Sequence, residues 1–290
     1  MPIRAILAAI LVACCWGGNF IAAKFSMMEF PPLLTVFLRF ALLSILLTPF
    51  VFSQKIPPLR DIVILSLTMI VIQFGLVFTG MHMGLSITSV IIATQLGVPF
   101  SCLLAAIAFK DYLGPWRAGG LMVAFMGVMI VAGTPNASEH WGAFALCVMG
   151  AFSWAIANIH MKRMAHISTV SFIFWPGLCS LPLLLLLSVL RESPTIAMLT
   201  HAHLISWLGI VYSSIISSIV AYGLWNILIT RYDISQVVPY SLLVPVVGIA
   251  GGMAAFGEPL SVQVLLGAAL TMIGVAVITI RRPRLAEMEP

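Results

Sequence analysis

Residues 4–25, RAILAAILVACCWGGNFIAAKF, form an apolar run with one basic residue near each end. Their length matches a bilayer-spanning α-helix, which needs roughly 20 apolar residues. Similar runs follow along the chain, separated by turn-forming pairs such as Pro31-Pro32 and Gly114-Pro115. The sequence therefore predicts ten transmembrane helices, at 4–25, 32–53, 61–82, 87–109, 116–134, 141–162, 169–190, 204–228, 235–256 and 260–280.

The composition of the whole chain points to a membrane protein. Of 290 residues, 61% are hydrophobic and 8% are charged, whereas a soluble domain carries roughly 25% charged residues. The basic residues behind the net charge of +5 sit singly between apolar runs and in the C-terminal tail, which does not suit nucleic-acid binding. The predicted fold is all-α and integral to the membrane, and the predicted partners are the lipid bilayer and a small-molecule substrate.

The five cysteines all lie within apolar runs and are odd in number, so no disulfide framework is expected. Leu11-Val12-Ala13-Cys14 resembles a lipoprotein cleavage box, but the apolar run continues past Cys14. The N-terminal segment is therefore expected to remain as a helix. No cofactor, metal site or catalytic residue is predicted, because no metal-ligand spacing is evident.

Lysine and arginine set the predicted orientation, because basic loops stay in the cytoplasm. With the N-terminus inside, all 14 of these residues except Lys24, Arg191 and Arg39 fall on the cytoplasmic side. We expect both termini to be cytoplasmic, in a bacterial inner membrane.

The two halves of the chain repeat, with 1–135 and 141–281 as predicted units and 282–290 as a cytoplasmic tail. Each unit has five spans, an odd number, so the second must be inverted relative to the first. Inverted repeats are typical of secondary transporters that bind substrate between the halves near mid-membrane. Trp16 and Lys24 match Trp154 and Lys162 at an offset of 138, while Asp111, Leu113, Gly120 and Gly127 match Glu258, Leu260, Gly267 and Gly274 at an offset of 147.

Several stretches along the chain resemble the EamA-type exporters of the drug/metabolite transporter superfamily. Within that family the sequence is most similar to the exporters of cysteine and O-acetylserine and to the aromatic amino-acid exporters. The resemblance implies a transporter of small metabolites. The stretches are Trp16-Gly17-Gly18-Asn19-Phe20, Pro31-Pro32 with Leu38-Arg39-Phe40, Ala151-Phe152-Ser153-Trp154, Tyr222-Gly223-Leu224-Trp225, Arg231-Tyr232, the run from Ser241 to Gly248, and Gly257-Glu258-Pro259-Leu260.

Tryptophan and asparagine occur together in the two spans that open the repeats. Trp16 with Asn19, and Trp154 with Asn158, lie one helical turn apart. Both tryptophans lie about 12 to 14 residues into their spans, which is too deep for the aromatic belt at a membrane surface. We expect all four to line a substrate cavity, with helix packing as the alternative for the asparagines.

Span 204–228 has the clearest polar stripe, because its members recur at spacings of three and four and share one face. Polar groups are costly against lipid, so this face lies against a helix or a wet cavity. Amphipathic aromatics can stack on a substrate and donate a hydrogen bond, whereas serines alone favour helix contacts. The stripe holds Ser214 and four predicted substrate-binding residues, Ser218, Tyr222, Trp225 and Asn226.

Two glutamines lie at mid-membrane positions, Gln73 in the third span and Gln95 in the fourth. Gln95 is expected to share a helix face with Thr88 and Cys102. A buried amide must find partners, so each glutamine is predicted either to contact substrate or to form an interhelical hydrogen bond.

Prolines interrupt matched spans of the two halves: Pro99 in the fourth span, and Pro239 and Pro245 in the ninth. Broken helices in corresponding positions mark transporter sites, because proline bends the helix and frees a backbone carbonyl. We assign these three a gating or structural role, with an ordinary packing kink as the alternative.

The charged residues are expected almost entirely outside the membrane, since all nine acidic residues fall at predicted helix ends, in loops or in the tail. Arg39 lies roughly 10 Å into its span. It could attract a substrate carboxylate, or it could snorkel to the surface or bind backbone carbonyls. Glu258 is expected to stabilise the start of the last helix, and Lys24 and Lys162 are assigned to gates or interfaces.

The function that follows is export of amino acids or related small metabolites by alternating access. The absence of a predicted intramembrane carboxylate favours a facilitator over a proton-driven pump. Two alternatives are an organic-cation or multidrug exporter, which would use such a carboxylate, and a membrane-embedded enzyme, which would need a catalytic constellation that the sequence does not offer.

Overall fold

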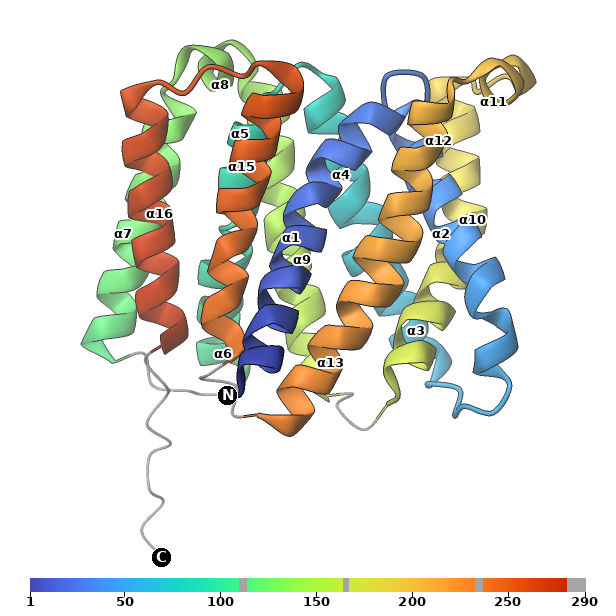
Figure 1. The fold of residues 1–290 in the computed structure, drawn as a ribbon, viewed down its shortest axis with the longest axis horizontal. Coiled ribbons are helices and arrows are strands. Elements are labelled where there is room, and N and C mark those ends of the chain that lie inside the picture. Colours follow the sequence, from blue (N-terminus) through green and yellow to red (C-terminus); the bar gives the residue numbers. More distant parts are fainter. Residues whose placement is uncertain (110–113, 164–166, 233–236, 281–290) are drawn as a thin grey trace, which may run out of the picture.

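The chain folds into a bundle of long helices (Figure 1). The computed structural model describes residues 1–109, 114–163, 167–232 and 237–280; Asp111 and Leu113 of the repeat pattern lie outside them. Within these segments, nine helices are long and apolar enough to cross a membrane, and Tyr240–Phe256 is a shorter apolar helix at the position of the ninth predicted span. The prediction of an all-α membrane protein with ten crossing segments is confirmed.

The first half contains five crossing segments, two of which are divided. Pro32 and Pro115 each occupy the first turn of a helix, where the missing N–H of proline costs nothing. The elements are α1 (Ile3–Ser26), α2 (Pro32–Val51), α3 (Leu59–Leu65), η1 (Ser66–Ile72), α4 (Gln73–His82), α5 (Ile87–Thr94), α6 (Gly97–Phe109) and α7 (Pro115–Ala132).

The second half has the same plan, and two short helices, α8 and α11, lie at the end of the bundle opposite the start of α1 (Figure 1). We call the end where α1 begins the N-terminal end and the opposite one the far end. The elements are α8 (Pro135–Glu139), α9 (Trp141–Arg163), α10 (Thr169–Glu192), α11 (Ile196–His201), α12 (Leu204–Val211), η2 (Tyr212–Val220), α13 (Ala221–Arg231), η3 (Val238–Leu242), α15 (Leu243–Phe256) and α16 (Val262–Ile280).

Irregular segments occupy corresponding places in the two halves. The third crossing segment of each half contains a π-helix in its middle, η1 or η2. The fourth is also divided in each half, between α5 and α6 in the first and between the 3₁₀ helix η3 and α15 in the second. Mid-helix irregularities of this kind are frequent at functional sites, and paired ones are typical of transporters built from inverted repeats.

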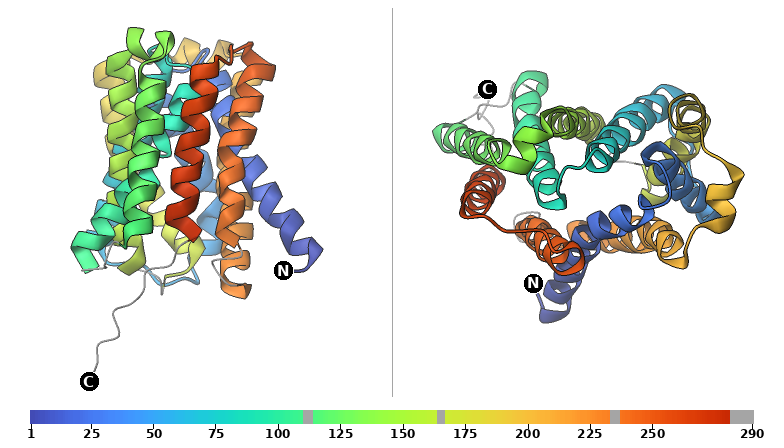
Figure 2. Two further views of the ribbon diagram at one scale, coloured as in Figure 1. Left: turned by 90° about the vertical axis from the view of Figure 1, so that its left-hand side faces the viewer. Right: turned by 90° about the horizontal axis from the view of Figure 1, so that it is seen from above.

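Glycines show how the halves meet. Seen down the bundle, α7 and α16 lie side by side at one edge (Figure 2). A Cβ added to Gly127 would lie 2.6 Å from the carbonyl oxygen of Gly267, and one on Gly274 would lie 2.5 Å from that of Gly120. In the repeat, Gly120 matches Gly267 and Gly127 matches Gly274, but in the structure Gly127 meets Gly267 and Gly274 meets Gly120. An inverted two-fold relation between the halves produces this crossed pairing.

Candidate functional site

An aromatic cluster joins the two halves through three of the predicted site residues. Trp16 of α1 lies with its ring centre 5.3 Å from Tyr222 and 5.2 Å from Trp225, both on α13. Its indole Nε1 donates a hydrogen bond of 3.1 Å to the carbonyl of Ser217 in η2. Edge and tilted ring contacts at such distances are favourable, so the cluster is a partly buried contact between the halves.

Ser218 and Arg39 form a second contact between the halves. Arg39 Nη2 donates to the hydroxyl of Ser218 over 3.0 Å, and Ser218 itself donates to the carbonyl of Ser213 over 2.8 Å. The hydroxyl of Ser214 donates to the main-chain carbonyl of Arg39 over 2.9 Å. Arg39 is only 2% exposed, so its side chain lies inside the bundle and does not reach the surface.

The polar stripe of the eighth span contacts both α1 and α2. Its serines, Ser214 and Ser218, contact α2, and Trp225 contacts α1. Tyr222 contacts Trp16 of α1 and also packs against the apolar cluster that includes Leu43 and Leu47 of α2. The π-helix η2 changes the angular spacing that α-helical periodicity assumes. Asn226 also has a partner in the structure.

Trp154 and Asn158 lie on α9 and contact the first half at α6. A Cβ added to Gly97 would lie 2.9 Å from the Trp154 ring. The Asn158 amide donates to the hydroxyl of Ser101 over 3.0 Å. These contacts correspond in the inverted plan to those of α1 with α15, and they do not include the aromatic cluster around Trp16.

Two of the predicted amide side chains carry buried oxygens without a hydrogen-bond partner, Asn19 Oδ1 in α1 and Gln73 Oε1 at the start of α4. Gln95 lies at the break between α5 and α6, at the C-terminal end of α5. The expectation that Gln95 shares one face with Thr88 and Cys102 assumed a continuous helix, and the helix is interrupted at residues 95–96.

The predicted gating and structural residues lie at different levels of the bundle. Lys24 Nζ lies 5.7 Å from the centre of the Phe256 ring, at the far end. Pro99 and Pro245 are buried, two residues beyond the start of α6 and of α15 respectively. The side chains of Lys162 and Pro239 lie outside the described part of the structure.

Two carboxylates at the far end of the bundle cap helices of the other half. Glu192, at the end of α10, accepts from the amides of Leu33 and Leu34 over 2.6 and 3.0 Å. Glu258 accepts from the amides of Ile87 and Thr88 over the same distances. Glu258 therefore stabilises the start of α5 rather than of the last helix, which corrects the expectation above; the reason is that the free N–H groups at α5 lie within its reach.

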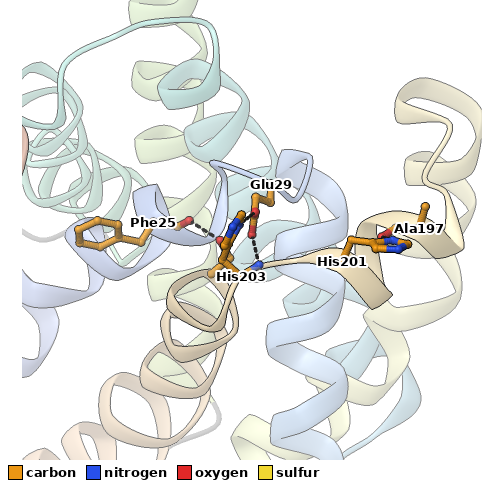
Figure 3. Close-up of polar contacts among 6 residues, drawn as sticks. Phe25, Glu29, Ala197, His201 and His203 are labelled. Atoms are coloured by element: carbon orange, nitrogen blue, oxygen red, sulfur yellow. Dashed lines mark hydrogen bonds and ion pairs between the residues drawn. The ribbon is translucent and has the colours of Figure 1, made fainter.

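Glu29 and His203 form a third tie at the far end (Figure 3). The carboxylate of Glu29 bonds the Nδ1 atom of His203 and accepts from its main-chain amide over 2.7 Å. Beside it, the hydroxyl of Ser206 donates to the carbonyl of Phe25 over 3.2 Å. The hydrogen bond with His203 lowers the pKa of Glu29, and the same bond raises the pKa of His203.

The N-terminal end of the bundle contains a groove. A groove of about 590 Å³ lies between α3, α6 and α9, lined mainly by apolar side chains such as Ile64 and Ile159. Asp61 and His160 lie in its wall, with Oδ1 and Nε2 2.9 Å apart. The sequence had no pattern that pairs these residues, and the same holds for Glu29 with His203 and for Phe74, whose ring lies 4.5 Å from the Arg39 guanidinium carbon.

Comparison with known proteins identifies the family. Two relatives named "Probable amino-acid metabolite efflux pump", from Salmonella typhimurium and Escherichia coli, are 32% identical to this chain and cover 92% of it and 91% of their own length. The "Uncharacterized transporter YoaV" of Bacillus subtilis is 24% identical over 94% of this chain and 96% of its own.

A solved structure described as "Crystal structure of protein" has the same fold, with a TM-score of 0.67 at 19% identity over 96% of this chain and 97% of the other. The model of the EamA-like transporter family matches residues 3–133 and again residues 140–280. The resemblance seen in the sequence is confirmed. Because the family model covers both halves, this chain belongs to the EamA-like transporter family and is a multi-pass membrane protein.

Proposed function

We propose that this protein exports amino acids or closely related small metabolites from the bacterial cytoplasm, by alternating access of a site between its two halves. The observation that carries the proposal is the composition of that site: three clustered aromatic rings, neutral hydrogen-bonding groups and one arginine between the halves. Such walls suit a zwitterion with an apolar or small polar side chain. The names of the two relatives at 32% identity refer to amino-acid metabolite efflux.

In this proposal the N-terminal end of the bundle faces the cytoplasm and the far end faces the periplasm. The distribution of lysine and arginine supports that orientation. The groove between α3, α6 and α9 then serves as the cytoplasmic entrance. The ties of Glu29, Glu192 and Glu258 hold the periplasmic exit shut, so that release of substrate requires them to separate.

The charges of the site favour this function over an organic-cation exporter. A cation site in the membrane would use a carboxylate, and the described acidic residues, Glu29, Asp61, Glu139, Glu192 and Glu258, lie at helix ends or in loops. The family is a transporter family, which disfavours the alternative of a membrane-embedded enzyme.

The decisive experiment compares substrates in proteoliposomes that contain the purified protein. We expect labelled neutral amino acids, such as cysteine, O-acetylserine and phenylalanine, to leave preloaded vesicles faster than from protein-free controls. The protein should not increase the efflux rate of a lipophilic cation such as tetraphenylphosphonium. Transport of the cation alone would replace this proposal with the organic-cation alternative.

A further inference from the structure

Arg39 is a charged side chain buried in the middle of a membrane protein. It is 2% exposed, and in the described segments no carboxylate lies within ion-pairing distance of it. Arginine stays protonated in proteins, and a buried charge is costly unless it is paired and hydrogen-bonded. A neutral residue could form the hydrogen bond between α2 and η2 without the cost of a buried charge. The positive charge of Arg39 therefore indicates a further, negatively charged partner.

The contacts of Arg39 compensate only part of that cost. Its guanidinium carbon lies 4.5 Å from the ring centre of Phe74 and 5.5 Å from that of Phe40, and such cation–π contacts are stronger when they are desolvated. Nη2 donates to Ser218 over 3.0 Å. The Nε and Nη1 atoms are buried and have no hydrogen-bond partner.

The unpaired nitrogens specify the ligand by their chemistry. A guanidinium binds the two oxygens of a carboxylate in one plane through Nη2 together with either Nε or Nη1, and Nη2 has a second N–H group besides the one bonded to Ser218. These charge-assisted bonds are about twice as strong as neutral ones. Phosphate groups are commonly recognised by clusters of arginine, whereas Arg39 has Phe40, Phe74 and Ser218 around it. One positive charge matches the single negative charge of a monocarboxylate.

The position of Arg39 connects this group to the site. Ser218 lies one turn before Tyr222, and Tyr222 contacts Trp16. Tyr222 also packs against the apolar cluster that includes Leu43 of α2, the helix that carries Arg39. We propose that Arg39 is the carboxylate subsite of the transporter. It holds the α-carboxylate of the substrate beside Ser218, while the side chain of the substrate lies against the aromatic cluster. This inference rests on the proposed function and adds the residue that recognises the substrate's negative end.

The test is discrimination between a substrate and its analogue without the carboxylate. Efflux of phenylalanine is compared with that of 2-phenylethylamine, and cysteine with cysteamine, for the wild type and for Arg39→Gln. The wild type should favour the amino acid, and Arg39→Gln should reduce that preference on the order of ten- to a hundredfold, the range for hydrogen bonds to a charged group. Arg39→Lys, which keeps the charge but not the planar geometry, should fall between.

Arg117→Gln provides a matched control. Arg117 Nε and Nη1 are also buried and unpaired, but the residue lies in the first turn of α7 and bonds Cys102 at the N-terminal end. Its replacement should leave the preference unchanged. If Arg39→Gln does not fold, Arg39→Lys and Phe74→Leu decide the matter, since both alter the guanidinium or its support without removing every contact.

The outcomes separate this inference from the proposed function. If the wild type exports both members of each pair equally, or if Arg39 variants lose both equally, Arg39 is a structural tie and the inference is wrong while amino-acid export stands. If the wild type exports no amino acid, the proposed function fails, whatever the Arg39 variants do. Loss of the amino acid with retention of the amine supports both.

Discussion

At the scale of single residues, Trp16 makes two separable contacts with the other half. Its ring lies against Tyr222 and Trp225, and its Nε1 bonds the Ser217 carbonyl. Trp16→Phe keeps an aromatic ring but removes the hydrogen bond, and Trp16→Ala removes both. We expect transport to fall about tenfold or more in Trp16→Ala, from the combined worth of the ring contacts and the bond, and less in Trp16→Phe.

The measurement is the initial efflux rate per amount of folded protein, so that loss of yield is not counted as loss of function. Trp141→Ala is the control, because Trp141 is an exposed tryptophan at the start of α9 that stacks on Phe144 outside the site. Equal effects on yield and on rate per folded molecule would mean that Trp16 serves packing alone.

The pair Glu29–His203 predicts a pH dependence at the far end. The pKa of Glu29 is lowered and that of His203 is raised by their hydrogen bond, so both are charged and the tie is fully formed between those two values. As pH rises through the raised pKa of His203, the imidazolium loses its proton and the tie weakens. We therefore expect efflux to quicken as the pH on this side rises above the ordinary histidine pKa of about 6.5 and through the raised pKa of His203.

The effect should be modest, because the His203 side chain is 83% exposed and exposed pairs are weak. His203→Asn should remove the pH dependence. His201→Asn should retain it, since His201 bonds Ala197 of its own helix instead (Figure 3). The His201 ring also bonds the hydroxyl of the neighbouring Thr200. A pH profile that survives His203→Asn would place the titrating group elsewhere.

The aromatic residues of the site could be predicted because depth in a span and spacing along a helix are properties of the sequence. Depth and spacing predict Trp16, Tyr222 and Trp225 as site residues, and the structure brings the three together. The surroundings of Arg39 could not be predicted in the same manner. They depend on which helix faces α2, and the partners Phe74 and Ser218 are 35 and 179 residues away in the chain.

At the scale of helices, the packing of α7 on α16 depends on glycine. A Cβ on Gly127 would lie 2.5 Å from the backbone nitrogen of Thr271 and 2.6 Å from the Gly267 oxygen, and neither backbone atom can move without displacing α16. We expect Gly127→Ala to destabilise the protein by about 1–3 kcal/mol, the usual cost of overpacking. Thermal or denaturant unfolding in detergent measures this.

Gly119→Ala is the matched control on the same helix. A Cβ at Gly119 meets nothing within 4 Å, and alanine has a higher helix propensity than glycine by about 1 kcal/mol. The control should therefore be neutral or slightly more stable. If both variants lost stability equally, the effect of alanine in α7 would reflect helix propensity or lipid contact. It would not reflect the close approach of the α7 and α16 backbones.

Helix lengths and the repeat could be predicted, because apolar run length and matched positions such as Gly120 with Gly267 are visible in the sequence. The division of the fourth span at Gln95 and the π-helix η2 were not predicted in detail. Both depart from the α-helical hydrogen-bond pattern, and α-helical spacing assumes that this pattern is constant. The polar stripe was predicted on α-helical spacing, which the π-helix η2 does not keep.

At the scale of the whole molecule, the proposed orientation places the far end in the periplasm. Ser138 and Ser53 are exposed serines near opposite ends of the bundle. In a variant without its five own cysteines, Ser138→Cys should react with a membrane-impermeant thiol reagent added to intact cells, and Ser53→Cys should react only after the membrane is opened. The opposite result would invert the assigned direction of transport.

The last prediction concerns energy coupling, and it too depends on the whole molecule. A proton-driven transporter commonly holds an Asp or Glu in the membrane, where desolvation raises its pKa so that it loads and releases a proton in each cycle. The described carboxylates instead lie at helix ends and in loops, where Glu29, Glu192 and Glu258 tie the halves together. We therefore expect a facilitator. In proteoliposomes loaded with amino acid, a pH gradient of either sign should change the rate of efflux, because it changes the protonation of His203. The amino acid should still reach equal concentrations on both sides of the membrane. Uphill accumulation driven by the gradient would contradict this, and Asp61 with His160, 2.9 Å apart in the wall of the N-terminal groove, would then be the first pair to replace.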